Sequence, residues 1–374
     1  MHPALLHTPS LLVTVAAFLL MLAPLIVLHE LGHYLVARWC GVRADAFSVG
    51  FGKELLGWTD KRGTRWKLSA VPLGGYVQFA GDMNAMSMPA AEAAQLAPEE
   101  RQGIFQFHPL WQRTLIVLAG PMMNLLVALA IFTGFNMAYG RIVAAPVIAG
   151  FADPSPAQAA GLRIGDRIVK VDGEPIVDFD EVRERVYPYP GDQLTLTVLR
   201  AGKPLTVTLI IADKVHRDEF GNESRVGQIG VAAGGLQLVR STALEALRLS
   251  VDQSAGIVRL MVTGIRQIVV GQRSVQELGG PVKIAQFSGQ QLSLGIVPFV
   301  YFAAFISINL AFINLLPIPA LDGGHLAFYA AEAVRRKPLG VRSQEWAFRT
   351  GLAFVLALML FVTINDLVSL RLFG

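Results

Sequence analysis

Long runs without charged residues alternate with stretches of ordinary polarity along the chain. A helix of about 20 apolar residues crosses the hydrocarbon core of a bilayer. The apolar runs that reach or approach this length are residues 10–28, 114–139, 284–321 and 350–365. The last lies between Arg349 and Asp366, so a helix of spanning length there would need both charged ends to snorkel. We therefore expect four transmembrane helices.

Composition and charge support a membrane protein and exclude other classes. The 374-residue chain is 53% hydrophobic and 16% charged, with a mean hydropathy of +0.48, which excludes a disordered or collagen-like chain. Its net charge of +4 is dispersed without a Lys/Arg block, so nucleic acid is not an expected partner. The single cysteine, Cys40, permits no cysteine-based metal cluster, so a metal would be held by His, Asp or Glu.

The placement of Lys and Arg predicts the orientation of the chain. Basic residues concentrate between the first two runs, from Arg38 to Arg113, and between the last two, from Arg335 to Arg342, whereas none precedes the first run. Connections rich in Lys and Arg stay on the cytoplasmic side of a membrane. Both termini and the long segment of residues 141–283 are then expected on the opposite side.

Residues 141–236 have the composition of a soluble domain, with turn signals at regular spacing. Alternating runs predict strands at residues 168–171, 194–199 and 205–211, and short helices fit residues 156–160 and 180–187. The run from Ser155 to Leu162, followed by Gly165-Asp166 and Asp172-Gly173, resembles a circularly permuted PDZ domain of bacterial envelope proteases. That resemblance implies a peptide groove between residues 147–151 and the second helix. The alternative is a packing module without a ligand.

Residues 237–290 contain apolar positions at helical spacing, from Leu244 to Ile268, with arginines interleaved. Such an amphipathic helix either lies on the membrane surface or packs on the preceding domain, and the sequence leaves both open. Residues 82–103, in another connection, have the composition of a linker.

The strongest chemical signal is HExxH, formed by His29, Glu30 and His33. On a helix the i, i+4 spacing places both imidazoles on one face, where they can hold one zinc ion while the glutamate reaches a bound water. The alternative is a polar helix end that snorkels. Ionisable residues inside a membrane are expensive and usually functional, which favours the metal site.

A catalytic zinc ion needs a third protein ligand, and the candidates are few. Asp322 ends the longest charge-free run, directly after Pro317 and Pro319, which break the helix there. Irregular backbone at membrane depth is tolerated where it is buried in protein or lines a cavity. Asp322 is therefore the expected ligand, and His325 is its competitor.

Three motifs together resemble the site-2 protease family of intramembrane zinc metalloproteases, in its bacterial RseP-type branch. They are HExxH in the first span, Gly120-Pro121-Met122-Met123-Asn124 in the second, and Asn314 to Gly323 (NxxPxPxLDG) in the third. The resemblance covers nearly the whole chain, and it implies that His29, His33 and Asp322 ligate Zn²⁺, that Glu30 is the base, and that Asn309 and Asn314 lie near the substrate or the oxyanion. The best-known members carry two tandem PDZ domains, whereas this chain has room for one.

A β-hairpin is expected at residues 66–79, as two apolar strands turning at Gly74 and Gly75. It resembles the membrane-dipping hairpin of this family, whose strand edge could hold an unwound substrate by backbone hydrogen bonds. An ordinary surface hairpin is the alternative.

These features predict a polytopic α-helical membrane protein with an inserted mixed α/β PDZ-like domain and a membrane-associated β-hairpin. The expected division is residues 1–140 (two spans with HExxH), 141–236 (PDZ-like domain), 237–290 (amphipathic segment) and 291–374 (two spans with LDG). The expected activity is zinc-dependent cleavage of single-pass membrane proteins, such as an anti-sigma factor, and of remnant signal peptides, in a bacterial inner membrane. The expected partners are this substrate, membrane lipid and a peptide at the PDZ-like domain. A proteolytically silent scaffold and a metal transporter are the competing hypotheses.

Overall fold

The computed structural model describes residues 9–80, 101–217, 223–271, 275, 279–337 and 340–369. It divides into two units. The first contains the chain up to Ile131 together with Gly279–Asp366, and the second contains Phe132–Leu278 and Leu367–Gly374. Most of the predicted linker at residues 82–103 lies outside the described residues.

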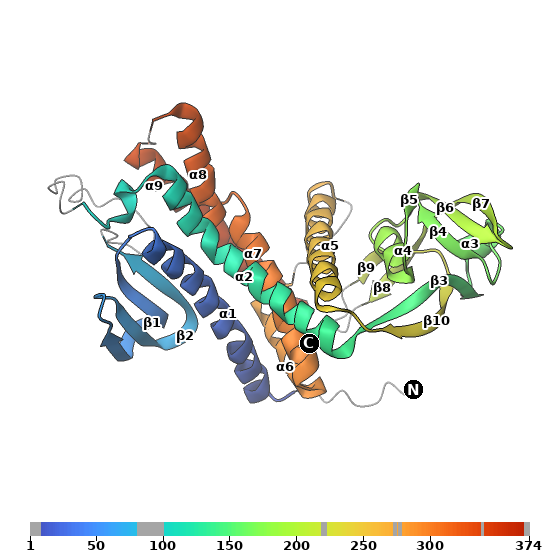
Figure 1. Cartoon of the computed structure of the whole chain (residues 1–374), viewed down its shortest axis with the longest axis horizontal. Helices are drawn as coiled ribbons and strands as arrows, with labels where there is room; N and C mark the ends of the chain where they lie inside the picture. The colour runs from blue at the N-terminus through green and yellow to red at the C-terminus, as the bar shows by residue number, and fades with distance from the viewer. Residues whose placement is uncertain are drawn as a thin grey trace. The chain divides into compact units, whose positions relative to one another are not determined.

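Four helices in the described part of the chain are long and apolar enough to cross a membrane, which confirms the expected number (Figure 1). They are α1 (Leu11–Trp39), α2 (Leu110–Tyr139), α7 (Ile296–Leu315) and α9 (Val341–Ser369). At 1.5 Å per residue, the 20 residues of α7 extend about 30 Å, the thickness of a hydrocarbon core. The architecture is that of a polytopic membrane protein.

The charge-free run of residues 284–321 forms two helices. The first, α6 (Pro281–Leu294), ends at Gly295, whose φ of +126° interrupts the helix, and α7 begins at the next residue. α6 packs against α1 and α7. Only the second helix of this run therefore has the length and apolarity of a span.

Asp366, near the end of α9, is fully buried, so the prediction that it snorkels is wrong. Its carboxylate accepts hydrogen bonds from the backbone N–H groups of Gly280 (3.0 Å) and Lys283 (3.1 Å). Gly280 is the N-cap of α6 and Lys283 lies in its first turn, where backbone N–H groups lack partners within the helix. Lys283 Nζ lies 3.8 Å from the same carboxylate. The acid is thus satisfied inside the protein and caps a neighbouring helix.

The first unit also contains the antiparallel pair β1 (Ala44–Thr59) and β2 (Arg65–Phe79). Residues 60–64 join them, and the Asp60 carboxylate orders this turn by accepting from the backbone of Arg62 and Thr64 and from the Trp66 indole. The predicted turn at Gly74 and Gly75 is wrong, because both lie within β2. The register shifts several times, and Phe47 has partners in both halves of β2.

A core cluster fastens this pair to the end of α1 and the start of α2. Its buried members include Tyr34 of α1, Phe47 of β1 and Ile116 of α2. The remainder of the pair carries exposed large apolar side chains, namely Phe51, Leu55, Leu56, Trp58, Leu68 and Val71. Exposed apolar groups gathered in one place are typical of a membrane or protein contact.

The second unit contains an inserted domain with one sheet, whose strand pairs are all antiparallel among the described residues. The sheet order is β10-β3-β4-β6-β7, with β5 beside β4, and the hairpin of β6 and β7 lies where the sequence predicts it. Two short helices, α3 (Pro156–Ala159) and α4 (Phe179–Val186), accompany it. The strands are β3 (Arg141–Phe151), β4 (Arg167–Val171), β5 (Glu174–Pro175), β6 (Gln193–Arg200), β7 (Lys203–Ile210) and β10 (Val231–Val239). A separate pair is formed by β8 (Ala212–Arg217) and β9 (Glu223–Gln228). One apolar cluster forms the core, and it includes Ile148, Ile168 and Leu196.

The amphipathic segment forms α5 (Ala243–Val269), which begins with a capping box between Thr242 and Glu245. The face of α5 that carries small residues is buried. Ser250 on this face accepts hydrogen bonds from the side chains of Thr133 and Asn136 at the end of α2. The apolar stripe on another face is exposed at Leu244, Leu247, Val251, Val262, Ile265 and Val269. The small face thus packs on protein, and membrane contact of the stripe stays a prediction.

Candidate metal centre

Three side chains converge in the first unit. His29 and His33 come from α1, and Asp322 is the first residue of α8 (Asp322–Arg335). Their ligand atoms all lie within 4.8 Å of one another. The two Nε2 atoms are 3.2 Å apart, and Asp322 Oδ2 lies 3.2 Å from His29 Nε2 and 3.5 Å from His33 Nε2. Residues almost 300 positions apart in the sequence are therefore brought together in one cluster.

The local sequence explains how Asp322 reaches the histidines. α7 ends at Leu315, and the segment containing Pro317 and Pro319 turns the chain so that α8 starts beside α1. The turn is tight, because a β-carbon on Gly323 would overlap the Leu316 carbonyl, and one on Gly324 would lie 2.5 Å from the Ile318 carbonyl oxygen. The two glycines after Asp322 therefore allow the aspartate to point at the cluster.

The donor set and its spacing fit zinc. Zinc holds His nitrogen and carboxylate oxygen at about 2.0–2.2 Å, so two ligand atoms of one tetrahedral ion lie about 3.4 Å apart. The three separations of 3.2, 3.2 and 3.5 Å agree with this value. Asp322 Oδ2 is buried without a hydrogen-bond partner among the described residues, as expected of an atom reserved for a cation. Three protein ligands leave a fourth position for water.

Groups on α2 contact the Nδ1 atoms of the two histidines, whose Nε2 atoms face the cluster. The Ile116 carbonyl oxygen accepts a hydrogen bond from His33 Nδ1 (2.8 Å), and the Asn124 amide lies 3.4 Å from His29 Nδ1. Gly120 lies between these two positions, and a β-carbon there would overlap the His33 ring. Pro121 is the next residue of the helix. Two residues of the second-span motif, Gly120 and Asn124, are thus at the cluster.

Glu30 faces the β1–β2 pair. Its Oε2 atom accepts a hydrogen bond from the backbone N–H of Val77 in β2 (3.2 Å). A β-carbon on Gly75 would lie 3.6 Å from Glu30 Cγ and would clash with the Ser48 carbonyl, and one on Gly74 would overlap the Phe51 ring. The glycine pair therefore lies in the strand that passes the glutamate.

The remaining predicted residues, Asn309, Asn314 and His325, are not among the three converging side chains. The Asn309 side chain donates to the Phe305 carbonyl of its own helix α7 (3.2 Å). Across the described residues, no side-chain hydrogen bond joins Asn309 or Asn314 to the cluster. His325 lies against Tyr329, with 6.5 Å between ring centroids, and is not among the converging ligands.

Sequence reasoning missed the Ile116 carbonyl and the Val77 N–H. Backbone groups carry no residue signature, so no motif could have indicated them. The spacing of four residues from Ile116 to Gly120, and again to Asn124, was the available hint, because residues four apart share one face of a helix.

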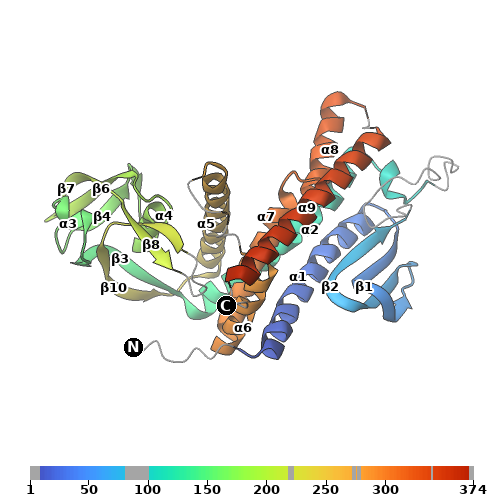
Figure 2. The ribbon, with the colours of Figure 1, turned by 180° about the vertical axis from the view of Figure 1, so that it is seen from behind.

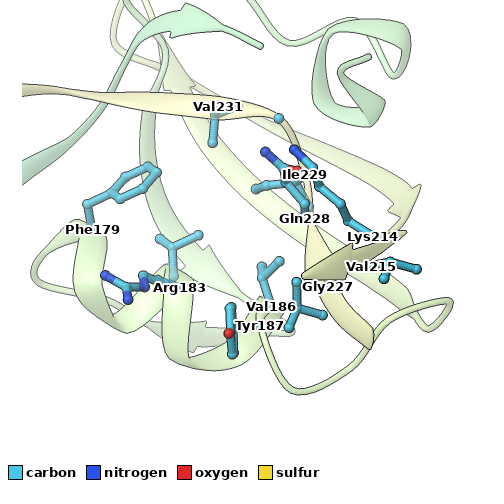
Figure 3. Close-up of a pocket in the computed structure, with 13 residues that line it drawn as sticks. Phe179, Arg183, Val186, Tyr187, Lys214, Val215, Gly227, Gln228, Ile229 and Val231 are labelled. Carbon is cyan, nitrogen blue, oxygen red and sulfur yellow. The ribbon is translucent and has the colours of Figure 1, made fainter. Parts of the chain in front are cut away.

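The second unit contains a cavity of about 340 Å³ in the inserted domain (Figure 3). Its walls come from α4, from β8 and from residues 226–231, which end β9 and begin β10. The lining is mainly apolar, with Arg183 and Lys214 as its cationic side chains. The cavity borders α4, as the expected groove does, but none of residues 147–151 is among its lining residues. α4 also packs against β3, which contains residues 147–151, so a peptide groove between them stays a prediction.

Comparisons with known proteins agree with this geometry. The model of peptidase family M50 matches residues 17–358. A relative in Agrobacterium fabrum, Atu1380, whose name describes a zinc metalloprotease, is 44% identical over 95% of this chain and 96% of its own length. The metalloprotease MmpA of Caulobacter vibrioides is 33% identical over 95% of this chain and 96% of its own.

The four apolar helices and the His-His-Asp cluster define a multi-pass membrane metalloprotease that uses Zn²⁺. The chain belongs to peptidase family M50, the site-2 proteases.

Proposed function

We propose that this protein is an intramembrane endopeptidase that cleaves single-pass membrane proteins in regulated intramembrane proteolysis. The observation that carries the proposal is the position of the ligands. His29 and His33 lie within the apolar helix α1, and both are more than nine-tenths buried. A hydrolytic centre built into a membrane span acts on bonds that lie in or beside the bilayer.

His29, His33 and Asp322 would hold the zinc ion. The bound ion supplies Lewis acidity toward water and toward the scissile carbonyl. Glu30 accepts a proton from the attacking water on its carboxylate and returns it to the leaving amine nitrogen, so that one water is consumed for each peptide bond broken. Its hydrogen bond from Val77 positions the carboxylate between β2 and the ligands.

The substrate is proposed to lie extended along β2. A helical peptide bond is hidden and its carbonyl is already hydrogen-bonded, so the substrate helix must unwind before cleavage. Backbone groups of Gly74 and Gly75 are proposed to pair with an extended chain, and the lack of a β-carbon at Gly75 lets this part of β2 pass close to Glu30. Asn309 and Asn314, on α7 ahead of the Asp322 turn, are proposed to contact the substrate or the oxyanion.

The proposed substrates are signalling proteins with one transmembrane helix, such as an anti-sigma factor already trimmed by another protease, and remnant signal peptides. The proposed location is a bacterial inner membrane, with the active site toward the cytoplasm and with both termini and the inserted domain on the other side. The Lys/Arg-rich connections at residues 38–113 and 335–342 support this orientation. The exposed apolar side chains of β1 and β2 support contact of that pair with lipid.

The inserted domain is proposed to be PDZ-like and to bind a peptide end in the cavity beside α4. Apolar walls suit a terminal apolar side chain, and Arg183 and Lys214 suit a terminal carboxylate. A charge reversal at both positions should weaken binding of a peptide with a free apolar C-terminus, measured by fluorescence anisotropy with the full-length protein. Lys203→Glu, at an exposed position on β7, is the control. Equal binding by all variants would exclude this peptide site.

The protease proposal is tested by Glu30→Gln. This variant removes the base but none of the three ligands, so it should retain zinc and lose cleavage of a co-expressed single-pass substrate. Mass spectrometry of membrane fragments that accumulate with the wild type, and not with the variant, would identify the substrate and the scissile bond. Glu345→Gln, on α9 and not among the converging ligands, is the matched control. Normal cleavage by Glu30→Gln would contradict the proposal.

A further inference from the structure

One face of α2 contacts both histidines of the proposed zinc site. Ile116, Gly120 and Asn124 follow each other at intervals of four residues, so they form one stripe along the helix. The Ile116 carbonyl oxygen accepts a hydrogen bond from His33, and Gly120 leaves room for the His33 ring. Asn124 lies beside His29. The stripe is thus arranged to set the orientation of two imidazoles that are themselves four residues apart.

The contact at His33 fixes the tautomer of that residue. A carbonyl oxygen can only accept, so His33 Nδ1 must carry a proton when it bonds to Ile116. In the neutral ring Nε2 then has a free lone pair, and Nε2 is the atom that points into the cluster. A metal-ligating histidine commonly donates its other N–H in this way, which holds the ring and raises its basicity.

His29 requires the same arrangement from Asn124. The Asn124 side chain is fully buried, its Nδ2 atom lies 3.4 Å from His29 Nδ1, and its Oδ1 atom has no hydrogen-bond partner among the described residues. If Nδ2 donated to Nδ1, the neutral His29 ring would carry its proton on Nε2 and could not bind a metal through that atom. A half-turn of the amide brings Oδ1 opposite Nδ1 and resolves the conflict.

We propose that Asn124 is a positioning residue for His29, whose Nδ1–H donates to the side-chain carbonyl oxygen of Asn124 and whose Nε2 atom is thereby kept free for zinc. This inference rests on the proposed zinc site, and it assigns a role to the asparagine of the Gly120 to Asn124 motif. The fully buried Ser307 of α7 donates to the Asn124 backbone carbonyl (2.7 Å), which holds this turn of α2 in place.

The test measures zinc affinity by chelator competition on the purified full-length protein, for the wild type and two variants. Asn124→Leu preserves size but removes the acceptor, and loss of such an outer partner typically weakens metal binding about 10–100-fold. Asn124→Asp keeps an acceptor oxygen at the same place and should bind zinc at least as tightly as the wild type. The visible spectrum of the cobalt-loaded forms should change for Asn124→Leu only. Asn136→Leu, farther along α2, is the matched control and should not change affinity.

Unchanged zinc affinity in Asn124→Leu would overturn the inference. Equal losses of zinc affinity in Asn124→Leu and Asn124→Asp would also overturn it, because they would indicate that Asn124 acts through packing alone. If Asn124→Leu does not fold, as judged by the melting of the metal-free protein, Asn124→Asp decides. Tight zinc binding by that variant supports an acceptor facing His29, and weakened binding contradicts it. A wild-type protein without stoichiometric zinc would overturn the zinc site itself, which is a distinguishable result.

Discussion

Gly351 of α9 packs directly on the Pro319 carbonyl. A β-carbon at position 351 would overlap the carbonyl oxygen of Pro319, so no other residue fits without a shift of the backbone. Pro319 precedes Asp322 by three residues in the turn between α7 and α8. The last long helix, visible along its whole length in Figure 2, therefore sets the position of the turn that delivers the third proposed ligand.

Gly351→Val should weaken zinc binding without touching a ligand. The added side chain must push α9 or the Pro319 turn aside, and a displaced turn moves Asp322 away from His29 and His33. We expect the zinc dissociation constant to rise by about tenfold or more, equivalent to about 1.4 kcal/mol. Chelator competition measures it, with Gly134→Val as control, because a β-carbon at position 134 has open space. Wild-type affinity in Gly351→Val would show that the turn does not depend on this contact.

Asp322→Asn should lower zinc occupancy, and His325→Gln should not. Asparagine lacks the charge that stabilises a divalent cation, whereas His325 lies outside the three converging ligands. Metal analysis of the two purified variants separates the two candidates for the third ligand. Loss of zinc in His325→Gln together with normal zinc in Asp322→Asn would reverse the assignment.

The stability of the inserted domain should depend on Asp166. Hydrogen bonds and charge from Arg200 hold the pKa of this nearly buried carboxyl below its ordinary value. A lowered folded-state pKa stabilises the domain above the unfolded-state pKa, and this stabilisation is lost as the pH falls through the folded-state pKa. Asp166→Asn should therefore destabilise the domain by about 1.5–3 kcal/mol at pH 7.

The difference between wild type and Asp166→Asn should shrink as the pH is lowered below about 4, the ordinary pKa of aspartate. Hydrogen exchange in peptides from β4 and β6 of the full-length protein measures this difference in the stability of the domain. Asp213→Asn, on β8, is the control, because Asp213 is more exposed than Asp166. A constant difference from pH 7 to pH 3 would contradict the role of the ionised carboxyl.

The features that the sequence predicted are those with local signals. The four spans, the β6–β7 hairpin and the HExxH helix each follow from a run, an alternation or a spacing that neighbouring residues carry. The β1–β2 turn was misplaced because Gly74 and Gly75 have the composition of a turn, whereas the real turn at residues 60–64 is ordered by the side chain of Asp60. Turn composition alone does not show which of two candidate turns is used.

The features that the sequence missed depend on contacts between distant elements. The carbonyl of Ile116 and the N–H of Val77 reach the histidine and glutamate side chains only because α2 and β2 pack on α1. The burial of Asp366 was missed because the helix that it caps is distant in the sequence: Gly280, the N-cap of α6, lies 86 residues earlier in the chain. Helix capping between elements has no spacing rule, so a charged residue in an apolar run does not reveal whether it faces water or protein.

The Asp366 cap should make a large contribution to the stability of the first unit. Asp366→Ala removes the acceptor for two N–H groups of α6, and the buried Lys283 loses this carboxylate partner. Breaking a buried pair on one side costs about 3–5 kcal/mol. The double variant Asp366→Asn with Lys283→Met removes both charges and keeps an acceptor for α6, so it should be more stable than Asp366→Ala. Denaturant titration in detergent measures the order of stability of these variants, with Glu345→Ala, whose side chain is 38% exposed, as control. If Asp366→Ala is no less stable than that control, the buried carboxylate does not hold α6 in place.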